Sequence, residues 1–293
     1  MEPLITIQIL NWNRASETLR SIKSALCQTY KNIEIIIVDN CSTDESVNLI
    51  RQTYPDLKII ELDQNYGCPG GRNRGIPYCN GDYIFYLDND GVLHKDAVKN
   101  AYRTISIDSK IGVVTGTVYD FVDESEIDSS CLIRNDKKYL FNNFQGGICL
   151  HRKSIYAEIG FYPDHFMYGA EEYFLTLKLF EAGISIAKDE SVVLWHVRSK
   201  AARNRGAELR NAYFNKLYIA VTLFPWLQAI KFFFYFIPTY IYYSKKEGYL
   251  KIFLDGYLNT LVGTIKRGLN KRTPIQQKTY VKFKSFQRVE LPD

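Results

Sequence analysis

The chain of 293 residues is long enough for one large domain or two smaller ones, and its hydrophobic content of 46% and charged content of 24% are those of an ordinary globular protein. Its six cysteines are scattered without C-x-x-C spacing, so the sequence indicates neither a zinc site nor a disulfide framework, and a reducing compartment fits best. The opening MEPLITIQIL has no basic region and predicts a first strand, not a signal peptide.

The net charge of +5 conceals an uneven distribution. Residues 198–293 hold 18 Lys and Arg against 5 Asp and Glu, a net of +13, while residues 1–197 hold 19 against 27, a net of −8. An acidic first part followed by a basic, aromatic part implies two roles. The partner of the basic part is expected to be polyanionic, and a membrane surface or a nucleic acid are the candidates.

The first hundred residues alternate strand and helix patterns. The predicted strands are Ile5–Leu10, Ile33–Val38, Leu57–Leu62 and Tyr83–Leu87. The predicted helices are Arg14–Cys27, a helix through Val47, Leu49 and Ile50 that Ser42, Thr43 or Asp44 caps, and a short helix after a Gly-rich loop. This alternation predicts an α/β fold with a parallel sheet covered on both faces, in which ligands bind beyond the carboxyl ends of the strands.

Beyond residue 111 the pattern is less regular. Strands are predicted at Ile111–Val118, Tyr139–Phe144 and Ser191–Val197, and a helix at Glu172–Ala182 that ends at Gly183. The apolar segment 217–243 is long enough to span a bilayer, but Lys231 and two prolines argue against spanning. Its tyrosines and flanking lysines suit helices that lie in a membrane interface, and buried core helices are the alternative.

Two carboxylates close the segment GDYIFYLDNDG (81–91). Asp88 and Asp90 follow a buried strand, and their spacing of two residues predicts that both side chains face the same way. Hard oxygen ligands in this spacing suit Mg²⁺ or Mn²⁺, and with the metal a diphosphate. Asp39 ends the second strand and is expected to line the same crevice. An acidic turn without a ligand is the alternative.

Seven marked stretches follow one another along the chain. They are ILNWNR (9–14), VDNCSTD (38–44), NYGCPGGRNRGI (65–76), LDNDG (87–91), GGICLHR (146–152), MYGAEEYFL (167–175) and WH (195–196). This series resembles family 2 of the inverting nucleotide-sugar glycosyltransferases, in particular the rhamnosyltransferase-like members that build bacterial surface polysaccharides. The resemblance covers residues 4 to about 200. It implies the GT-A fold, a Rossmann-like, mostly parallel sheet with helices on both faces, as a catalytic domain over 1–200, followed here by a largely helical region over 201–293.

The resemblance also implies a donor site. Asp39 holds the acidic position that recognises the nucleoside, and Asn40 replaces a more usual Asp there, although an amide still donates and accepts. Gly67, Gly70 and Gly71 are expected to lie in a loop that lets the backbone approach the ligand, and Arg72 is expected near the diphosphate. The implied donor-binding set is Asn11, Asn13, Arg14, Asp39, Asn40, Asn65, Gly71, Arg72, Asp88 and Asn89. A helix-capping turn is the alternative for Asp39, and an ordinary surface arginine is the alternative for Arg72 and for Arg74, which follows it in the same stretch.

The metal site follows from the same resemblance. Asp88 contacts the ribose region and counts among the metal-site residues, Asp90 binds Mn²⁺ or Mg²⁺ directly, and His196 resembles a third metal contact. The metal neutralises charge on the departing nucleotide diphosphate. A packed structural histidine is the alternative for His196.

The position of the catalytic base departs from the family pattern. Members usually carry Glu-Asp, a variable residue and another Asp, whereas this chain reads Glu171-Glu172-Tyr173-Phe174. Glu172 takes the base position, and its extra methylene moves the carboxylate outward by about 1.5 Å. Glu171 is implied on the acceptor side with Gly146 and Gly147, where side chains would crowd the incoming hydroxyl. A plain turn is the alternative for the two glycines.

The sequence therefore predicts an inverting, metal-dependent hexosyl- or deoxyhexosyltransferase that acts on a nucleotide-diphosphate sugar and on a glycan or lipid-linked glycan. It is expected in the cytoplasm, peripheral on the inner face of an anionic cell membrane, with a homo-oligomer through residues 201–293 left open and no nucleic-acid partner. A non-catalytic nucleotide-sugar-binding or scaffold subunit of a membrane assembly is the rival, because of the altered 171–174 motif and the apolar C-terminal segment. A nucleotidyltransferase ranks lower, because no Gly-rich basic loop follows the first strand.

Overall fold

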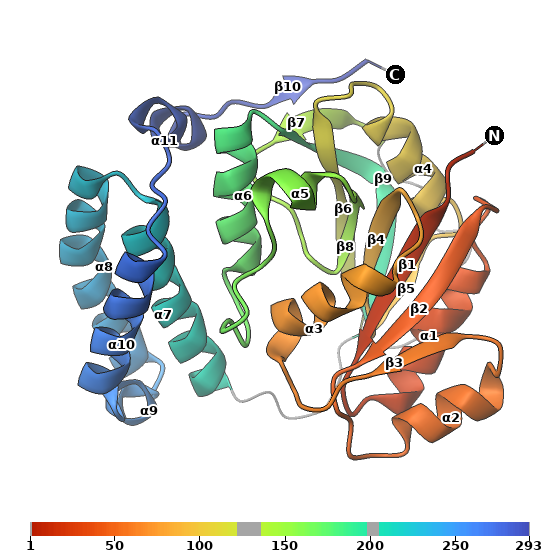
Figure 1. The fold of residues 1–293 in the computed structure, drawn as a ribbon, viewed down its shortest axis with the longest axis horizontal. Helices are drawn as coiled ribbons and strands as arrows, with labels where there is room; N and C mark the ends of the chain where they lie inside the picture. The colour runs from red at the N-terminus through yellow and green to blue at the C-terminus, as the bar shows by residue number, and fades with distance from the viewer. Residues whose placement is uncertain (1, 122–135, 198–204, 293) are drawn as a thin grey trace.

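A mixed β-sheet forms the centre of the protein in the computed structural model, which describes residues 2–121, 136–197 and 205–292 (Figure 1). Its strands are β1 (Ile5–Asn11), β2 (Ile33–Asp39), β3 (Lys58–Glu61), β4 (Tyr83–Asp88), β5 (Gly91–Leu93), β6 (Ile111–Phe121), β7 (Lys138–Phe141), β8 (Ile148–Arg152), β9 (Ser185–Val197) and β10 (Val289–Glu290). The strand order is β10-β7-β9-β6-β8-β4-β1-β2-β3, and β5 pairs with β9.

The first half of the sheet has the predicted arrangement. Strands β3, β2, β1 and β4 are parallel neighbours, so the carboxyl ends of β1, β2 and β4 lie at one edge. Strand β8 runs antiparallel to both β4 and β6, and sequence reasoning did not identify it as a strand. The sheet is therefore mostly parallel in its first half and mixed beyond β4.

Helices cover both faces of this sheet, as predicted. They are α1 (Ala15–Leu26), α2 (Ser46–Thr53), α3 (Gly67–Gly75), a 3₁₀ turn η1 (Ile76–Tyr78), α4 (Ala97–Ile105), α5 (Ile155–Ile159) and α6 (Glu171–Ala182). Alternate residues of β2 belong to two separate apolar clusters: Ile35 and Ile37 pack with α1, α2 and α4, whereas Ile36 and Val38 pack with α5 and α6. This double burial explains the unbroken β-branched sequence of β2.

One local prediction is wrong, and another is correct only in part. The glycines that follow Asn65 do not form an open loop, because α3 begins at Gly67, and Gly71 and Gly75 of this helix pack against the sheet. A Cβ atom on Gly71 would lie 2.5 Å from Leu10, and one on Gly75 would lie 2.3 Å from the Gln8 side chain. Helix α2 begins at Ser46 after Glu45, so Ser42, Thr43 and Asp44 all precede its cap position, but the Asp44 carboxylate still accepts a hydrogen bond from the first helical N–H, that of Ser46, at 3.1 Å. The same turn also binds the end of β2, because Ser42 donates two hydrogen bonds to Asp39.

The C-terminal region is helical, as predicted. It contains α7 (Arg205–Leu223), α8 (Trp226–Lys246), α9 (Leu250–Leu254), α10 (Tyr257–Asn270) and α11 (Gln277–Lys284), and the apolar segment 217–243 is divided between α7 and α8 at Pro225. Figure 1 shows α7 next to α6, with α8 and α10 outside α7, on the side of the molecule away from α1 and α2. No helix in the described part of the chain has the length and apolar content needed to cross a membrane.

Candidate active site

The site lies at the carboxyl edge of β1, β2 and β4. Asn11 ends β1 in register with Asp39 of β2, and Asp88 ends β4 in register with Leu10. Strand β4 stops at Asp88, and Asn89 and Asp90 form a turn, so the two-residue repeat of a strand does not extend to Asp90. Asp88 and Asp90 therefore bind different partners, contrary to the expectation that both face the same way.

Asp39 is buried and fully engaged within its own turn. Its Oδ1 accepts hydrogen bonds from the amide of Asn11 (2.7 Å) and the hydroxyl of Ser42 (2.6 Å), and its Oδ2 accepts one from the Ser42 backbone N–H (2.9 Å). Asn13, in the left-handed region at φ 52°, accepts from the Thr43 N–H at 2.7 Å. These contacts hold the β1 and β2 loops together as one rim of the site. Sequence reasoning missed Ser42, although a serine three residues after an aspartate is a usual turn signal.

Asn40 fastens the segment that leads into α3. Its Nδ2 donates to Asn65 Oδ1 and to the carbonyl of Gly67, both at 3.0 Å, and its Oδ1 accepts from the Tyr66 N–H at 3.0 Å. Asn65 in turn accepts from the Gly67 N–H at 2.8 Å. A carboxylate could not donate to the two acceptors, so this network gives Asn40 a local reason to replace the family's Asp.

Arg72 is buried at the centre of the site and connects two predicted groups. Its Nη2 lies 2.7 Å from Asp88 Oδ1. A Cβ atom built on Gly146 would lie 2.4 Å from Arg72 Nη1 and 2.6 Å from Glu172 Oε1, and one on Gly147 would lie 2.0 Å from Asp88 Oδ2. The two glycines therefore make room for the protein's own charged side chains, a different reason from the predicted acceptor clearance.

One nitrogen of the Arg72 guanidinium is available for a ligand. Arg72 Nη1 is buried and has no hydrogen-bond partner within the described residues. The guanidinium also lies 5.7 Å from the Tyr86 ring centre, and Tyr86 continues into a buried chain through the Tyr156 hydroxyl (2.8 Å) to His151 Nδ1 (2.9 Å). Burial, then the charge of Arg72, lowers the pKa of His151 to about 3, so this ring is neutral at pH 7. This buried cluster of Tyr86, Tyr156 and His151 packs beside Arg72, and sequence reasoning did not identify it.

Glu171 and Glu172 occupy the first turn of α6. Glu172 is partly exposed and its Oε1 accepts the Gly146 N–H at 3.3 Å, whereas Glu171 is buried and its Oε2 has no partner among the described residues. Burial raises the pKa of both carboxyls, and the charge of Glu172 raises that of Glu171 further, while Arg72 acts in the opposite direction on both. Of the two residues, Glu172 is the less buried. Phe174, which stands where family members usually carry the second Asp, packs in the apolar core near Tyr218 of α7.

Asp90 and His196 come together as predicted. Asp90 Oδ2 lies 3.2 Å from His196 Nε2 and 2.6 Å from Arg14 Nη1, and His196 Nδ1 lies 2.8 Å from Asp120 Oδ1. Asn89 donates to the Thr18 hydroxyl at 3.3 Å, which steadies the turn. Asp120 was missed because it faces His196 only through the pairing of β6 with β9.

These residues fit a divalent cation. If His196 donates its Nδ1–H to Asp120, the lone pair of Nε2 faces Asp90 Oδ2, which is favourable only with a proton or a metal ion between them. The hydrogen bond to Asp90 raises the pKa of His196 accordingly. No group of three or more His, Cys, Asp or Glu side chains arranged for a metal occurs within the described ranges. Phosphate oxygens and water would have to complete the coordination, as is usual for Mg²⁺.

Arg74 does not belong to the site. Its guanidinium lies 3.2 Å from the ring centre of Tyr66 and 3.5 Å from Asp164, which is the surface role weighed as its alternative.

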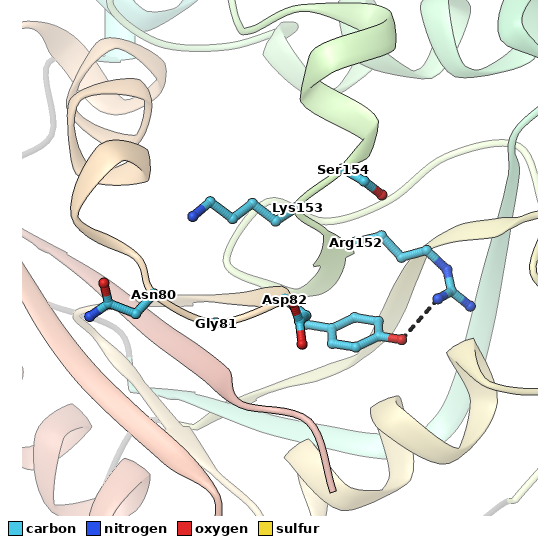
Figure 2. A pocket seen from close by; sticks show the side chains of 7 residues that line it. Asn80, Gly81, Asp82, Arg152, Lys153 and Ser154 are labelled. Atoms are coloured by element: carbon cyan, nitrogen blue, oxygen red, sulfur yellow. Dashed lines mark hydrogen bonds between the residues drawn. The ribbon is translucent and has the colours of Figure 1, made fainter.

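A separate pocket of about 390 Å³ lies at the opposite ends of the strands, beside the start of β4, around Asp82 and Lys153 (Figure 2). Its basic groups are already engaged: Arg152 donates to the Tyr83 hydroxyl and to the carbonyls of Ile105 and Ile111, and Lys153 donates to the Cys79 carbonyl. This pocket is therefore a weaker candidate for the active site than the carboxyl ends of β1, β2 and β4.

The strand order and the polar site at the carboxyl ends of β1, β2 and β4 are those of the GT-A nucleotide-sugar transferase fold. The family model described as glycosyl transferase family 2 matches residues 6–162, more than half of the chain. The chain therefore belongs to glycosyl transferase family 2. The rhamnosyltransferase-like subtype, the division at residue 200 and the individual site roles remain predictions.

Relatives and solved structures agree with this assignment. An uncharacterized glycosyltransferase of Rickettsia prowazekii is 28% identical over 228 residues, 73% of this chain and 68% of that protein. The Escherichia coli UDP-Glc:alpha-D-GlcNAc-diphosphoundecaprenol beta-1,3-glucosyltransferase WfaP is 42% identical over 89 residues, 30% of this chain and only 35% of that protein. The mannosyltransferase PcManGT from Pyrobaculum calidifontis, solved with GDP-Man and Mn²⁺, has a similar fold, with a TM-score of 0.61 and 17% identity over 97% of this chain and 88% of that one.

Proposed function

We propose that this protein is a metal-dependent, inverting hexosyl- or deoxyhexosyltransferase. It moves a sugar from a nucleotide-diphosphate donor to a hydroxyl of a glycan or lipid-linked glycan in the synthesis of bacterial surface polysaccharide. The observation that carries the proposal is the buried Arg72, which binds Asp88 on one side and lies close to Glu172 on the other. This arrangement supports a donor site and a base within one crevice.

Glu172 is the proposed base. Its carboxylate takes the proton of the acceptor hydroxyl while the acceptor oxygen bonds to the anomeric carbon of the sugar. The bond from that carbon to the phosphate oxygen breaks, and the nucleotide diphosphate leaves with the electron pair from the opposite face. Inversion follows from this single displacement. Placement of Glu172 in the first turn of α6 favours its ionised form, because the helix dipole stabilises negative charge there.

The donor is proposed to bind across the loops of β1, β2 and β4. Asp39 and Asn40 lie on the nucleoside side, and Arg72 offers its unpaired Nη1 to a phosphate oxygen. Asp90 and His196 would hold Mn²⁺ or Mg²⁺, with Asp88 beside them, and a bound cation supplies charge neutralisation for the leaving diphosphate. Arg14 holds Asp90 in position from the β1 side.

A lipid-linked acceptor and a cytoplasmic location on the inner face of the cell membrane complete the proposal. The acceptor is supported by the name of the E. coli relative, whose substrate is a sugar on diphosphoundecaprenol. The location is supported by the net charge of +13 over residues 198–293.

The proposal is tested by incubating the protein with a panel of nucleotide sugars, with and without Mn²⁺. We expect hydrolysis or transfer of at least one donor, lost on metal removal. Glu172→Gln should keep donor binding and lose about 10²- to 10⁴-fold in turnover, and Arg74→Gln is the matched control that keeps it. Donor binding without turnover, even with a lipid-linked acceptor, would favour the scaffold subunit, and retained turnover in Glu172→Gln would remove Glu172 as the base.

A further inference from the structure

Helices α8 and α10 present apolar side chains outward, where a surface helix normally carries polar ones. On α8, Leu227, Ile230, Phe234 and Ile241 share one side, and Phe234 is 81% exposed. On α10, Leu258, Val262 and Leu269 form a stripe, and Leu258 is 71% exposed. We call these seven residues the α8–α10 face. Contiguous exposed apolar surface of this kind marks an interaction site in a soluble protein.

The two helices also enclose a groove. A pocket of about 320 Å³ lies between them, lined by Trp226, Ile230 and Phe233 of α8, by Ile265 and Leu269 of α10, and by Val221 of α7. Every side chain that lines it is apolar. Such a groove suits a hydrocarbon chain and offers nothing to a charged or hydrogen-bonding ligand.

Basic side chains surround this apolar face. Residues 226–271 contain seven Lys and Arg against only Glu247 and Asp255. Lys231 lies one helical turn from both Leu227 and Phe234, and Lys245, Lys246 and Lys266 are exposed beyond it. Apolar residues, tyrosines and lysines on one side of a helix are the composition of helices that lie in the interface of an anionic bilayer.

We propose that the α8–α10 face binds an anionic lipid bilayer, with lipid acyl chains entering the groove between the two helices. The inference rests on the proposed function in one respect, since it names the surface that brings the enzyme to a lipid-linked acceptor. A second copy of the chain fits less well, because a two-fold contact would bring the same basic residues against each other. A nucleic acid would leave Phe234 and Leu258 without an apolar partner.

Flotation with liposomes tests the proposal on the full-length protein without any donor or acceptor, so its result is independent of catalysis. We expect flotation with phosphatidylglycerol-containing liposomes at low salt and much less with phosphatidylcholine alone. The double substitution Phe234→Glu and Leu258→Glu should abolish flotation. Lys245→Ser with Lys246→Ser should weaken it on the order of 30-fold, because each lysine near such a surface contributes about a factor of five.

Matched substitutions on the catalytic side serve as controls. Leu26→Glu, at an exposed leucine of α1, and Lys23→Ser with Lys110→Ser should float like the unaltered protein. All variants are checked by circular dichroism. Because Trp226 is 58% exposed on the groove, brominated phospholipids should quench tryptophan emission of the unaltered protein, and Trp226→Phe should lose most of that quenching.

Three results would overturn the proposal. They are failure to float with any liposome, equal flotation of the Phe234 and Leu258 double variant, and quenching that does not depend on Trp226. A lipid-free dimer in sedimentation that this double variant dissociates would assign the face to a second copy instead.

Discussion

Arg72 sets the charge balance of the site at the residue scale. It is the buried cation among Asp88, Glu171 and Glu172; its Nη2 is paired with Asp88, and its Nη1 has no hydrogen-bond partner among the described residues. Its charge lowers the pKa of both glutamates, but burial raises the pKa of each by more. Both carboxyls of the site therefore ionise above the ordinary carboxyl range.

The pH dependence of turnover follows from these shifts. A base works only when ionised, so activity is present above the raised pKa of Glu172 and is lost as the pH falls through it. We expect the acid limb of kcat/KM to lie above the ordinary glutamate pKa of about 4.3. The measurement is a profile of kcat/KM from about pH 4.5 to 8, over which the protein is shown to stay folded.

Glu171→Gln is the informative control. Glutamine copies the protonated form of Glu171, whose pKa burial and the charge of Glu172 both raise. The acid limb should therefore move little in Glu171→Gln. A limb at the ordinary carboxyl pKa, or one that shifts strongly in this variant, would contradict the assignment of Glu172 as the titrating base.

The sequence predicted those site residues that stand beside a strand end or inside a motif. Asp39, Arg72, Asp88, Asp90 and His196 were all identified in this way, and the structure brings Arg72 to Asp88 and His196 to Asp90. Asp120 and Ser42 were missed. Asp120 reaches His196 only because β6 and β9 are neighbours, and no local pattern in the sequence specifies a pairing of residues 76 positions apart.

At the scale of elements, helix α7 positions the loop that leads into α6. Asn215 of α7 donates to the carbonyls of Tyr168 (3.2 Å) and Gly169 (2.7 Å). Gly169 and Ala170 both have left-handed backbones, with φ of 85° and 68°. A non-glycine residue in this region is strained, and the surrounding contacts must hold it there. Glu171 and Glu172 follow directly, so α7 helps to fix the direction in which the base projects.

Substitution of Asn215 should therefore reduce turnover more than donor binding. We expect Asn215→Leu to lower kcat about 10- to 100-fold, because a small displacement of a catalytic group is costly, with little change in KM for the donor. Steady-state kinetics measures both constants, and Asn211→Leu, one turn earlier on α7, is the matched control. A proportional loss of folded protein with unchanged kcat per folded molecule would show that Asn215 acts on stability alone.

Elements were predictable where a periodic pattern was long enough. Strands β1, β2 and β4 and helix α6 were found within a residue or two of their observed ends. Helix α3 was read partly as a loop because glycine usually breaks helices, and the close packing of Gly71 and Gly75 on Leu10 and Gln8 depends on tertiary contacts. Strand β8 was missed because its five residues, Ile148–Arg152, are too few to show a helix or strand period.

At the scale of the whole molecule, the apolar core crosses the predicted boundary at residue 200. One cluster contains Ile36 and Val38 of the sheet, Leu175 of α6, and Ile219 and Phe224 of α7 and its end. The uneven charge along the sequence predicts two functions, but the hydrophobic effect joins the two parts in one packed body. A shared core couples the unfolding of its parts, so we expect one cooperative transition.

Phe224→Ala tests this coupling. Phe224 is 1% exposed and its ring contacts Tyr173 of α6, Phe232 of α8 and Tyr280 of α11. Its removal should lower the free energy of unfolding by about 3–5 kcal/mol, the usual cost of a large cavity, and should shift the whole transition. Phe234→Ala, at a side chain exposed to solvent, should change it by less than about 0.5 kcal/mol. Denaturant unfolding followed by circular dichroism and by tryptophan emission measures both.

Two transitions, of which Phe224→Ala moves only one, would mean that the C-terminal helices fold separately from the sheet. In that case the contact between Asn215 and the 168–170 loop could be lost without unfolding the catalytic part, and membrane binding and catalysis would be separable by truncation.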